Sequence, residues 1–595
     1  MLHSPKSISL NAVRRQFGRI PSAAAAGSRV PAAPSVWVAT KVSVRMASTN
    51  HNTPVQNVRT PEDLASGKRE LATVRSSAAV HDSPGKEKVV ILGSGWGGYT
   101  FSRQVSPKQF SPVVISPRTY FVFTPLLTDA CGGSVDFSII TEPVRDRWCK
   151  ADYIQAAARS IDFNRKTVLC ESTVVHKDIS ETPRMFLERT DQENEEALNA
   201  ALADQKKWNK GDIFEIPYDK LVISVGAVAR TFKTPGVREN AMFFKDVGDA
   251  RQVKRRVQEC FELAALPTTS PEMRKYLMTF AIVGAGPTGT ELAGSLRDFI
   301  HGDMIRLYPS LQGLPHIVLY DVAPKVLSMF DDSLSQYAME TMRKEGITIL
   351  TSHHVKNLRW GAPHEPGPHE MDPRRCLTLE TAEEGEVGVG VCVWVTGNAQ
   401  RMLIRESMTG LEKFPVDSAI VRESESTPST ATEAAQDGTW HVRKSPRGGA
   451  LLVDNHLRVQ LENDKGQVAV MQDVFAFGDN SMLEVNPVPA TAQATRQEAK
   501  WLATRFNKGD INTSPPFSFE NMGVLAYLGD QQALMQLPKE EAQKHSFLPS
   551  YLKGKAAWIV WNSAYVGMSI SWKNKLRLVF RWFVNNLFGR DVSRF

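Results

Sequence analysis

Two glycine-rich runs carry the residues of this chain that are best suited to chemistry. They form a first fingerprint, Gly93-Ser94-Gly95-Trp96-Gly97-Gly98, and a second fingerprint, Gly284-Ala285-Gly286-Pro287-Thr288-Gly289. In such a run the first glycine permits a tight turn, the second lets a pyrophosphate approach the backbone, and the third lets a helix pack on a strand. Free N–H groups and the positive end of the helix dipole then face the phosphates. One run alone is also typical of an ordinary glycine-rich turn, but two runs predict two bound dinucleotides and therefore redox chemistry.

The strands around each fingerprint must position it. Each fingerprint follows a short apolar strand, expected over residues 88–92 and 280–283, and the next strand should end beside the adenosine ribose. The strand expected over 112–116 ends in Ser116, which departs from the usual carboxylate and bonds ribose hydroxyls more weakly. The strand expected over 317–321 ends in Asp321, whose charge suits the ribose of NADH and repels the 2′-phosphate of NADPH. A helix-capping role is the alternative for Asp321.

The composition excludes several other kinds of protein. A chain of 595 residues has room for about two to four domains. Its net charge of +7 is small for this length and forms no basic stripe with interleaved aromatics, so we expect no nucleic-acid partner. The cysteines show neither a CxxC pair nor metal-ligand spacing, so we expect no metal site and disfavour a disulfide reductase. They are Cys131, Cys149, Cys170, Cys260, Cys376 and Cys392.

The N-terminal segment has a composition of its own. Residues 1–60 contain no Asp or Glu, and arginines lie there among serines and alanines. This pattern predicts a mitochondrial transit peptide over 1–60, followed by a linker over 61–85. A disordered tail that lacks acids by chance is the alternative. No apolar run of about 18 residues follows, so we expect no membrane anchor there.

Several segments together resemble one family, the type II (alternative) NADH:quinone oxidoreductases, which are single-subunit FAD-dependent enzymes of respiratory membranes. The likeness runs from about residue 88 to the C-terminus. Besides the fingerprints it is carried by Ser116-Pro117-Arg118-Thr119-Tyr120-Phe121-Val122-Phe123-Thr124-Pro125-Leu126-Leu127, Phe477-Gly478-Asp479, Ala492-Gln493-Ala494-Thr495-Arg496-Gln497 and residues 588–595. The resemblance implies an α/β fold with two Rossmann-like dinucleotide-binding domains of the glutathione-reductase type. The NADH domain would be inserted in the FAD domain, and a C-terminal helical region would associate with a membrane.

The expected domain boundaries follow these motifs. Flavin-type strands, expected over 220–227, 391–397 and 473–479, lie on both sides of the second fingerprint and indicate a nested layout. Polar segments over 191–211 and 423–447 are expected to be surface insertions. We expect FAD-binding parts over 86–245 and 390–500, an NADH-binding domain over 246–389, and a membrane-anchoring and dimerisation region over 501–595.

The resemblance also implies which residues bind the cofactors, with FAD at the first fingerprint and NADH at the second. They are Gly93, Ser94, Gly95, Trp96, Gly98, Ser116, Arg118, Thr124, Pro125, Gly284, Gly286, Gly289, Asp321, Gly397, Gly478, Asp479 and Ala492. The family often has serine at the position of Ser116. Asp479 would accept hydrogen bonds from the flavin's ribityl or phosphate region, and Gly478 permits a close approach. A turn aspartate is the alternative for Asp479, as a plain loop is for Thr124 and Pro125.

Three residues are implied to be catalytic. Glu291 lies two residues beyond the second fingerprint, and the resemblance implies that it faces the nicotinamide and the flavin. Stabilisation of the helix dipole is its alternative role. Gln493 and Gln497 are four residues apart and therefore share one helix face. Their neutral amides suit a quinone carbonyl near lipid, whereas ordinary exposed glutamines are the alternative.

The C-terminal segment predicts contact with a membrane. Leu576, Phe580, Phe583 and Leu587 recur at helical spacing. Beside Trp572 and Trp582, basic residues offer contacts to anionic lipid: Lys573, Lys575, Arg577 and Arg581. We therefore expect an amphipathic helix at a membrane interface. A helix docked on a core or on a dimer partner is the alternative.

The resemblance implies a non-proton-pumping NADH:ubiquinone oxidoreductase, in which hydride passes from NADH to FAD and two electrons then pass to ubiquinone. We expect a peripheral homodimer at the lipid surface of the mitochondrial inner membrane, facing the matrix. A sulfide:quinone oxidoreductase is one alternative, which would need paired reactive cysteines and no nicotinamide site. A mitochondrial flavoprotein like apoptosis-inducing factor is another, which would lack the glutamine helix and the C-terminal amphipathic segment.

Overall fold

The computed structural model describes residues 72–73, 85–146, 149–174, 211–364, 376–408, 410–411, 413–422, 439–538, 549–569, 571–590 and 592. The predicted transit peptide, 1–60, lies outside the described residues, as does most of the predicted linker, 61–85. The predicted insertions are described only at residue 211 and over 439–447. All described residues belong to one compact unit, Glu70–Phe595.

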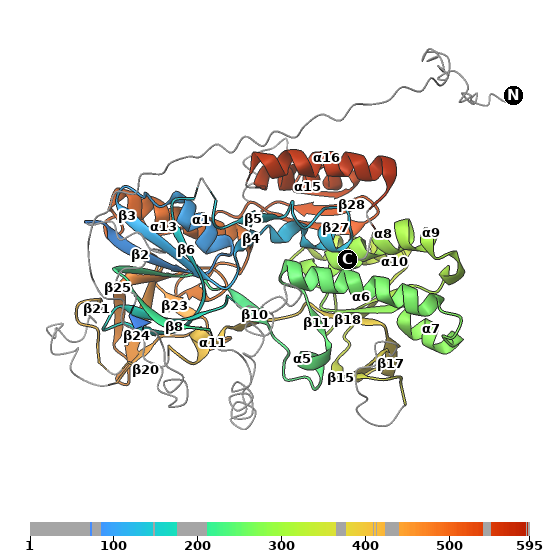
Figure 1. Ribbon diagram of the computed structural model, residues 1–595, viewed down its shortest axis with the longest axis horizontal. Coiled ribbons are helices and arrows are strands. Elements are labelled where there is room, and N and C mark those ends of the chain that lie inside the picture. The colour runs from blue at the N-terminus through green and yellow to red at the C-terminus, as the bar shows by residue number, and fades with distance from the viewer. Residues whose placement is uncertain are drawn as a thin grey trace, which may run out of the picture. The chain divides into compact units, whose positions relative to one another are not determined.

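The first fingerprint lies in a sheet with a parallel centre. The order at this centre is β6-β3-β2-β9-β25, and the fingerprint directly follows the central strand β2 (Figure 1). The strands are β6 Asp152–Asp162, β3 Phe110–Ser116, β2 Glu87–Leu92, β9 Lys220–Ile223 and β25 Val468–Ala476. The middle strands are continuous apolar runs because both of their faces are covered. Helix α1 (Trp96–Gln104) packs on β2 and β3, and α13 (Ala492–Lys508) packs on α1.

Further strands extend this sheet at both edges. One edge holds β7 (Thr167–Ser172), β8 (Ile213–Pro217) and β1 (Ala72–Thr73). The other edge holds β24 (Arg458–Asn463), β22 (Trp440–Val442) and β20 (Gly410–Leu411), with β21 (Ala419–Val421), β23 (Leu451–Val453) and β26 (Ser481–Leu483) beside them.

The second fingerprint lies in a separate, fully parallel sheet with the order β11-β18-β12-β13-β14. The strands are β11 Met242–Phe243, β18 Val391–Trp394, β12 Thr279–Val283, β13 His316–Asp321 and β14 Ile347–Thr351. The prediction that the strand over 391–397 belongs to the FAD-binding half is wrong. This strand is β18, and it pairs with β12 of the second sheet. The predicted domain boundary between residues 389 and 390 therefore separates β18 from the sheet to which it belongs.

The chain crosses between the two sheets twice. Strand β10 (Ala227–Ala229) leads out of the first domain, and β19 (Asn398–Gln400) leads back into it. These two strands pair with each other in antiparallel fashion. The second sheet is therefore inserted into the first domain, which confirms the predicted nested α/β fold.

The C-terminal region contains a sheet as well as the predicted helices. Strands β27 (Val524–Gly529), β28 (Gln532–Gln536) and β29 (Tyr551–Gly554) are antiparallel and precede α15 (Lys555–Met568) and α16 (Trp572–Phe588). Strand β27 approaches helix α8 (Pro287–Phe299) so closely that a Cβ on Gly294 would lie 2.6 Å from the Gly529 nitrogen. Among the described helices none is long and apolar enough to cross a membrane.

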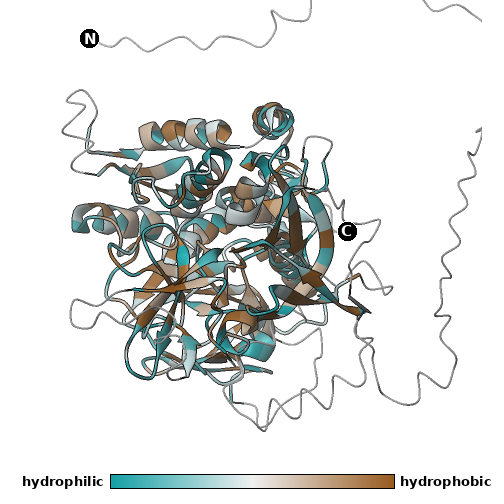
Figure 2. Ribbon diagram, turned by 90° about the vertical axis from the view of Figure 1, so that its left-hand side faces the viewer, coloured by the Kyte–Doolittle hydropathy of each residue, from teal (hydrophilic) through white to brown (hydrophobic). Residues whose placement is uncertain are grey.

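Shorter elements complete the described structure, and Figure 2 shows hydrophobic residues concentrated in the strands of its interior. In the first domain they are β4 Tyr120–Val122, η1 Thr124–Leu126, α2 Leu127–Cys131, β5 Thr141–Pro143 and α11 Met402–Arg405. In the second they are α5 Val237–Asn240, α6 Val247–Ala265, α7 Pro271–Leu277, the π-helix η2 Ile300–Met304, α9 Ile305–Leu307, η3 Pro309–Leu311, α10 Asp332–Lys344, β15 Val355–Trp360, β16 Leu377–Thr381 and β17 Gly385–Val389.

Candidate functional site

The first fingerprint forms a cradle whose shape depends on its glycines. Gly93 has φ +105°, and a Cβ there would collide with the backbone oxygen of Ser224 at the end of β9. A Cβ on Gly98 would collide with the Gly93 oxygen, because α1 lies directly on β2. At Gly95, in contrast, a Cβ would meet nothing within 4 Å. The open side of the loop is thus the side on which a pyrophosphate is expected.

The second fingerprint repeats this geometry. Gly284 has φ +114°, and a Cβ there would lie 2.9 Å from the Thr396 Cβ. A Cβ on Gly289 would collide with the Gly284 oxygen, whereas Gly286 faces open space. Neither α1 nor α8 has a side-chain cap or an acidic residue in its first turn, so N–H groups remain for a phosphate. The residues present therefore fit two dinucleotides.

The strand that follows each fingerprint is tied to it by a different group. Ser116, at the end of β3, is buried, and its Oγ lies 2.9 Å from the Oγ of Ser94. Asp321, at the end of β13, accepts hydrogen bonds from the N–H groups of Ala285 at 2.5 Å and Ala323 at 2.7 Å. No described helix begins at Asp321, so a helix cap does not explain it.

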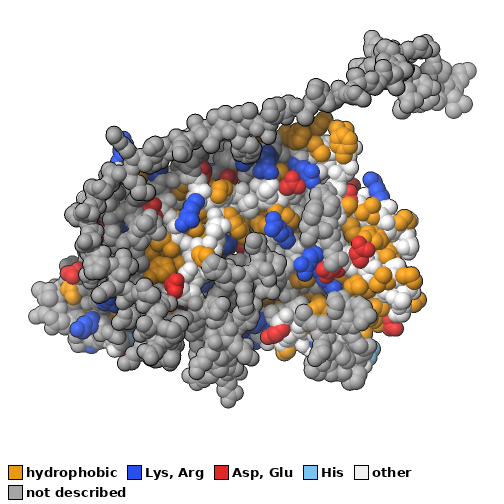
Figure 3. Space-filling view, in the orientation of Figure 1, with side chains coloured by type: hydrophobic (Ala, Val, Ile, Leu, Met, Phe, Trp, Pro, Cys, Tyr) orange, Lys and Arg blue, Asp and Glu red, His pale blue; other side chains and the backbone are white. Residues whose placement is uncertain are grey.

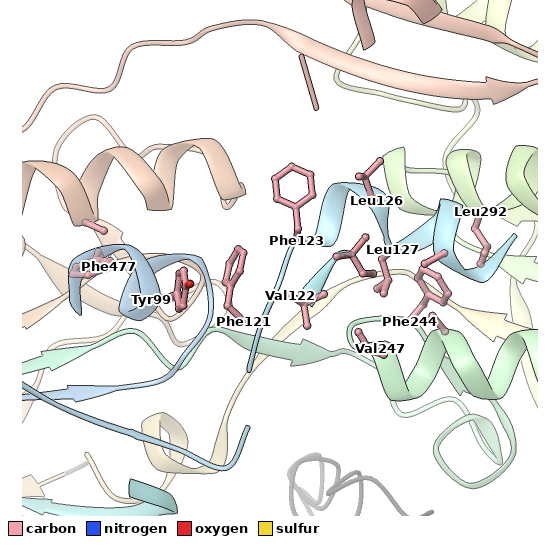
Figure 4. Close-up of a cluster of buried hydrophobic side chains, with 14 of the residues drawn as sticks. Tyr99, Phe121, Val122, Phe123, Leu126, Leu127, Phe244, Val247, Leu292 and Phe477 are labelled. Atoms are coloured by element: carbon pink, nitrogen blue, oxygen red, sulfur yellow. The ribbon is translucent and has the colours of Figure 1, made fainter. Parts of the chain in front are cut away.

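Trp96 connects the first fingerprint to the Phe-Thr-Pro-Leu-Leu segment. Its Nε1 donates to the Oγ1 of Thr124 at 2.9 Å, and its ring packs edge-on against Phe121 at 5.0 Å. Figure 4 shows how side chains of this segment continue the core from Tyr99 on α1 towards Leu292 on α8. Thr124 is exposed and Pro125 is half-buried, so both lie at the surface of this loop.

A second glycine turn faces helix α13. Gly478 has φ +82°, and its N–H donates to Glu498 at 3.0 Å. Burial raises the pKa of Glu498 to about 7, and the charge of Asp479 raises it further. Gly397, which follows β18, has φ +73°, and a Cβ there would lie 2.8 Å from the Phe232 ring. Both turns therefore depend on glycine.

Basic residues surround Asp479 at the crossing between the domains. Arg118 forms an ion pair with Asp246 at 3.4 Å, and Lys245 donates to Asn398 at 2.5 Å. Burial lowers the pKa of Arg401 to about 9, and it lowers the pKa of Lys245 as well. Sequence reasoning identified Arg118 and missed Lys245 and Arg401, because neither follows a recognisable motif.

The two predicted glutamines share one helix face but have different partners. Gln497 exchanges two hydrogen bonds with the backbone of Glu520, one at 2.8 Å as donor and one at 3.0 Å as acceptor. Gln493 accepts from the N–H of Met522 at 3.4 Å. The hydroxyl of Thr491 caps Ala494, one of the first free N–H groups of α13. Both glutamines therefore touch the segment that leads into β27.

Glu291 is buried where α8 meets the C-terminal region. It is 8% exposed and accepts from the N–H of Tyr527 on β27 at 3.4 Å. Burial raises the pKa of Glu291 to about 8, and the charge of Asp129 raises it further. A group that is neutral at physiological pH does little for a helix dipole. Sequence reasoning missed Asp129 and Tyr527, whose only signal is a polar residue within an apolar run.

Helix α16 presents its apolar face outwards. Trp572 is 78% exposed and Phe588 is 82% exposed. Leu576, Phe580, Phe583 and Leu587 are also exposed, and Figure 3 shows hydrophobic side chains along the edge where Figure 1 places this helix. The inward face combines the buried Leu578 with polar anchors: Arg577 donates to Ser138 at 2.7 Å, and Arg581 pairs with Asp136 at 3.2 Å. The prediction that these two arginines face lipid was wrong, because they hold the helix to the protein.

Comparisons with known proteins agree with this geometry. The sequence profile described as pyridine nucleotide-disulphide oxidoreductase matches residues 87–427, and that of the NDH2 C-terminal domain matches 521–591. A probable NADH dehydrogenase from Dictyostelium discoideum is 32% identical and covers 86% of this chain and 91% of its own length. The mitochondrial external alternative NADH-ubiquinone oxidoreductase of Yarrowia lipolytica is 30% identical, covering 86% and 81%. The structure of NDH2 from Plasmodium falciparum in complex with NADH shares the fold, with a TM-score of 0.63 and 22% identity over 85% of this chain and all of its own.

Proposed function

The chain belongs to the type II NADH dehydrogenases, the alternative NAD(P)H–ubiquinone oxidoreductases, and from this premise we propose that it oxidises NADH through FAD and passes two electrons to ubiquinone without pumping protons. One observation carries this proposal: two fingerprints of equivalent geometry each follow a strand with parallel neighbours, in two sheets of one unit. FAD would rest at Gly95 and the start of α1. NADH would rest at Gly286 and the start of α8.

The protein residues supply placement and control of protons in this reaction. FAD, when bound, supplies the transfer of hydride and electrons. Asp321 would accept hydrogen bonds from the ribose and repel a 2′-phosphate, which favours NADH over NADPH. Glu291, kept neutral by burial, would orient the nicotinamide and hold a proton at its carboxyl oxygen. Strand β27 and helix α15 lie over Glu291 and would exclude water.

The two glutamines would have different roles. Both ends of the Gln497 amide bond to Glu520, so this side chain would hold the segment before β27 in place. Gln493 uses its oxygen towards Met522, which leaves its NH₂ to donate to a quinone carbonyl. The first N–H groups of α13, at Ala492 and Gln493, would meet the flavin.

We propose that α16 docks on the lipid surface of the mitochondrial inner membrane. Its outward stripe is aromatic and aliphatic, and Lys573 and Lys575 remain beside Trp572 for anionic lipid. Binding to anionic vesicles should fall in a Leu576→Gln, Phe580→Gln variant. A homodimer through the same face is the other prediction, and sedimentation of the protein without lipid tests it. If the variant becomes monomeric but still binds vesicles, the lipid contact lies elsewhere.

A matrix-facing position is supported by the arginine-rich, acid-free segment over residues 1–60, a composition that directs proteins into mitochondria. The Yarrowia relative is named an external enzyme, so the side needs a direct measurement. Protease treatment of mitochondria and of mitoplasts should leave the protein intact in both. Digestion in mitoplasts would place it in the intermembrane space.

The structure disfavours sulfide chemistry as the alternative. All six cysteines are free thiols, and five of them are buried. Burial raises the pKa of Cys131, Cys170 and Cys392 to about 12, so the reactive thiolate is not formed near neutral pH. The flavoprotein alternative related to apoptosis-inducing factor would lack the glutamine helix and the C-terminal amphipathic segment, whereas this chain has both, as α13 and α16.

The central experiment measures NADH oxidation by the purified, flavin-loaded chain, with and without a short-chain ubiquinone. We expect oxidation that requires the quinone and exceeds the rate with NADPH. An apoprotein without flavin absorbance would overturn the proposal, and so would NADH oxidation that the quinone does not accelerate.

A further inference from the structure

A second buried carboxyl group accompanies Glu291. Asp129, on α2, is also 8% exposed, and α2 packs on α8. Three residues beyond Asp129, a Cβ on Gly132 would lie 2.8 Å from the oxygen of Ser295, which is four residues beyond Glu291. The two helix backbones are therefore in close contact one turn away from the two carboxyl groups. None of the assigned site residues includes Asp129.

Asp129 lacks a full set of partners. Its Oδ1 accepts from the hydroxyl of Ser134 at 3.1 Å, but its Oδ2 is buried without a hydrogen-bond partner. A buried carboxylate oxygen without a partner costs free energy, so this carboxyl group favours its protonated form. Burial raises the pKa of Asp129 to about 7, and the nearby charges of Arg590 and Asp298 act in opposite directions.

Strand β27, helices α6 and α15 and the C-terminal segment each contribute a polar group near this pair. On β27 the hydroxyl of Tyr527 donates to Asp298 at 2.5 Å, and on α15 burial raises the pKa of Tyr565, with further contributions from Glu291 and Asp129. The C-terminal Arg590 donates to the Gly132 oxygen at 3.0 Å and lies 3.9 Å from Asp298. On α6, Lys254 faces Cys131, two residues from Asp129. The ring of Trp561 contacts those of Tyr527 and Tyr565, so these aromatic side chains help to screen the pair from water.

The proposed reaction needs a proton at this place. Hydride transfer from NADH carries two electrons and one hydrogen, whereas a quinol has two new O–H bonds. One proton per turnover must therefore come from water, as in NADH + H⁺ + quinone → NAD⁺ + quinol. A group that is buried, neutral and able to exchange its proton is suited to this task.

We propose that Asp129 is a positioning residue that keeps Glu291 protonated and reloads it with one proton in each turnover. The inference rests on the proposed function of this site. It predicts that Asp129, deprotonated above about pH 7, acts through the negative charge that it then places beside Glu291. A packing role for Asp129 would leave the titration of Glu291 unchanged.

The test is the pH profile of quinone reduction by the flavin-loaded Asp129→Asn protein, across the neutral and alkaline range. In the unchanged protein the rate should fall as pH rises through about 8, where Glu291 loses its proton. In the variant a negative charge is absent, so this alkaline limb should move to lower pH by about one pH unit. Infrared difference spectra of reduced and oxidised protein should show the matching change in the Glu291 carboxylic acid band.

Two further variants complete the test. Ser134→Ala removes a bond that favours charged Asp129, so the limb should move in the same direction by a smaller amount. If Asp129→Asn does not bind flavin, the pH profile of Ser134→Ala alone tests the inference. Asp473→Asn is the matched control, since this aspartate is 6% exposed and lies on β25 of the first sheet, where it accepts from Ser418 and pairs with Lys166. An unchanged alkaline limb in the Asp129 and Ser134 variants would overturn the inference, whereas absence of quinone reduction in the unchanged protein would overturn the proposed function itself.

Discussion

The two fingerprints share a backbone and differ in what surrounds it. In both, the third glycine sits against the oxygen of the first, and the second glycine is open. In the first domain two serine hydroxyls, Ser94 and Ser116, join the loop to the next strand. In the second domain the Asp321 carboxylate joins the backbone of Ala285. The same link between loop and strand is therefore neutral in one half and charged in the other.

The helices that follow also differ, because only the second has an ionisable side chain at the matching position. Two residues beyond the third glycine, α1 has Thr100 and α8 has Glu291, and both are buried. A group that stays neutral suits a cofactor that remains bound through every turnover. A group that titrates suits a coenzyme that enters, reacts and leaves. Ionisable side chains, and not the glycine geometry, therefore distinguish the second half from the first.

The largest effect should come from the third glycines. Gly98→Val and Gly289→Val each place a side chain against a backbone oxygen that cannot move, at a cost of at least about 3 kcal/mol. We expect Gly98→Val to yield protein without flavin. Gly289→Val should keep its flavin absorbance but lose its reduction by NADH. Gly95→Ala, where space is open, should fold normally and bind flavin less tightly. Equal flavin loss in both valine variants would show that the two halves do not bind separate dinucleotides.

Exchanging the strand-end residue of the first half should have the next largest effect. Ser116→Asp buries a carboxylate beside Ser94 without a cation, which should lower the free energy of unfolding by about 3 kcal/mol. Ser116→Ala removes only the hydrogen bonds to Ser94 and to the N–H of Arg118, and it should cost about 1–2 kcal/mol. Denaturant unfolding of the flavin-loaded protein measures both. If Ser116→Asp is as stable as Ser116→Ala, the site already accepts a charge and the contrast with Asp321 fails.

The two buried positions after the glycines should differ in their response to pH. The pKa of Glu291 is raised from its ordinary value to about 8, so the folded protein binds this proton more tightly than the unfolded chain. The stability penalty from Glu291 therefore grows as pH rises from the unfolded pKa to about 8 and is constant above it. Glu291→Gln should raise the thermal midpoint by several degrees at alkaline pH and little at acid pH. Thr100→Val should show no such dependence. The same increment for Glu291→Gln at both pH extremes would contradict the raised pKa.

Much of this arrangement could be predicted from local patterns in the sequence. Glycine spacing and apolar strands sufficed for both fingerprints, the nested layout and the position of Asp321, because these are properties of short segments. The sheet of β18 could not be predicted, since a buried apolar strand that runs into a glycine is the same in either sheet. A helical pattern shows that α16 has two faces, but it does not show which face packs on the protein. The expected contact of Arg577 and Arg581 with lipid was therefore wrong, since both bind the protein. For Asp129 the local signal, a polar residue within an apolar run, was too weak, because its role depends on the contacts of α2 with α8.

The smallest expected effect concerns the choice of coenzyme. Asp321→Ser makes the second half resemble the first, removing the charge that repels a 2′-phosphate while keeping a short polar side chain. The ratio of kcat/KM for NADH to that for NADPH should fall about tenfold, which corresponds to about 1.4 kcal/mol. Asp332→Ser, at an exposed aspartate on α10, is the control and should leave the ratio unchanged. Because Asp321 also bonds to Ala285, some loss of activity with both coenzymes is expected, and only the ratio is diagnostic. An unchanged ratio would mean that Asp321 serves the loop alone and that the charge contrast between the two halves has no role in choosing NADH.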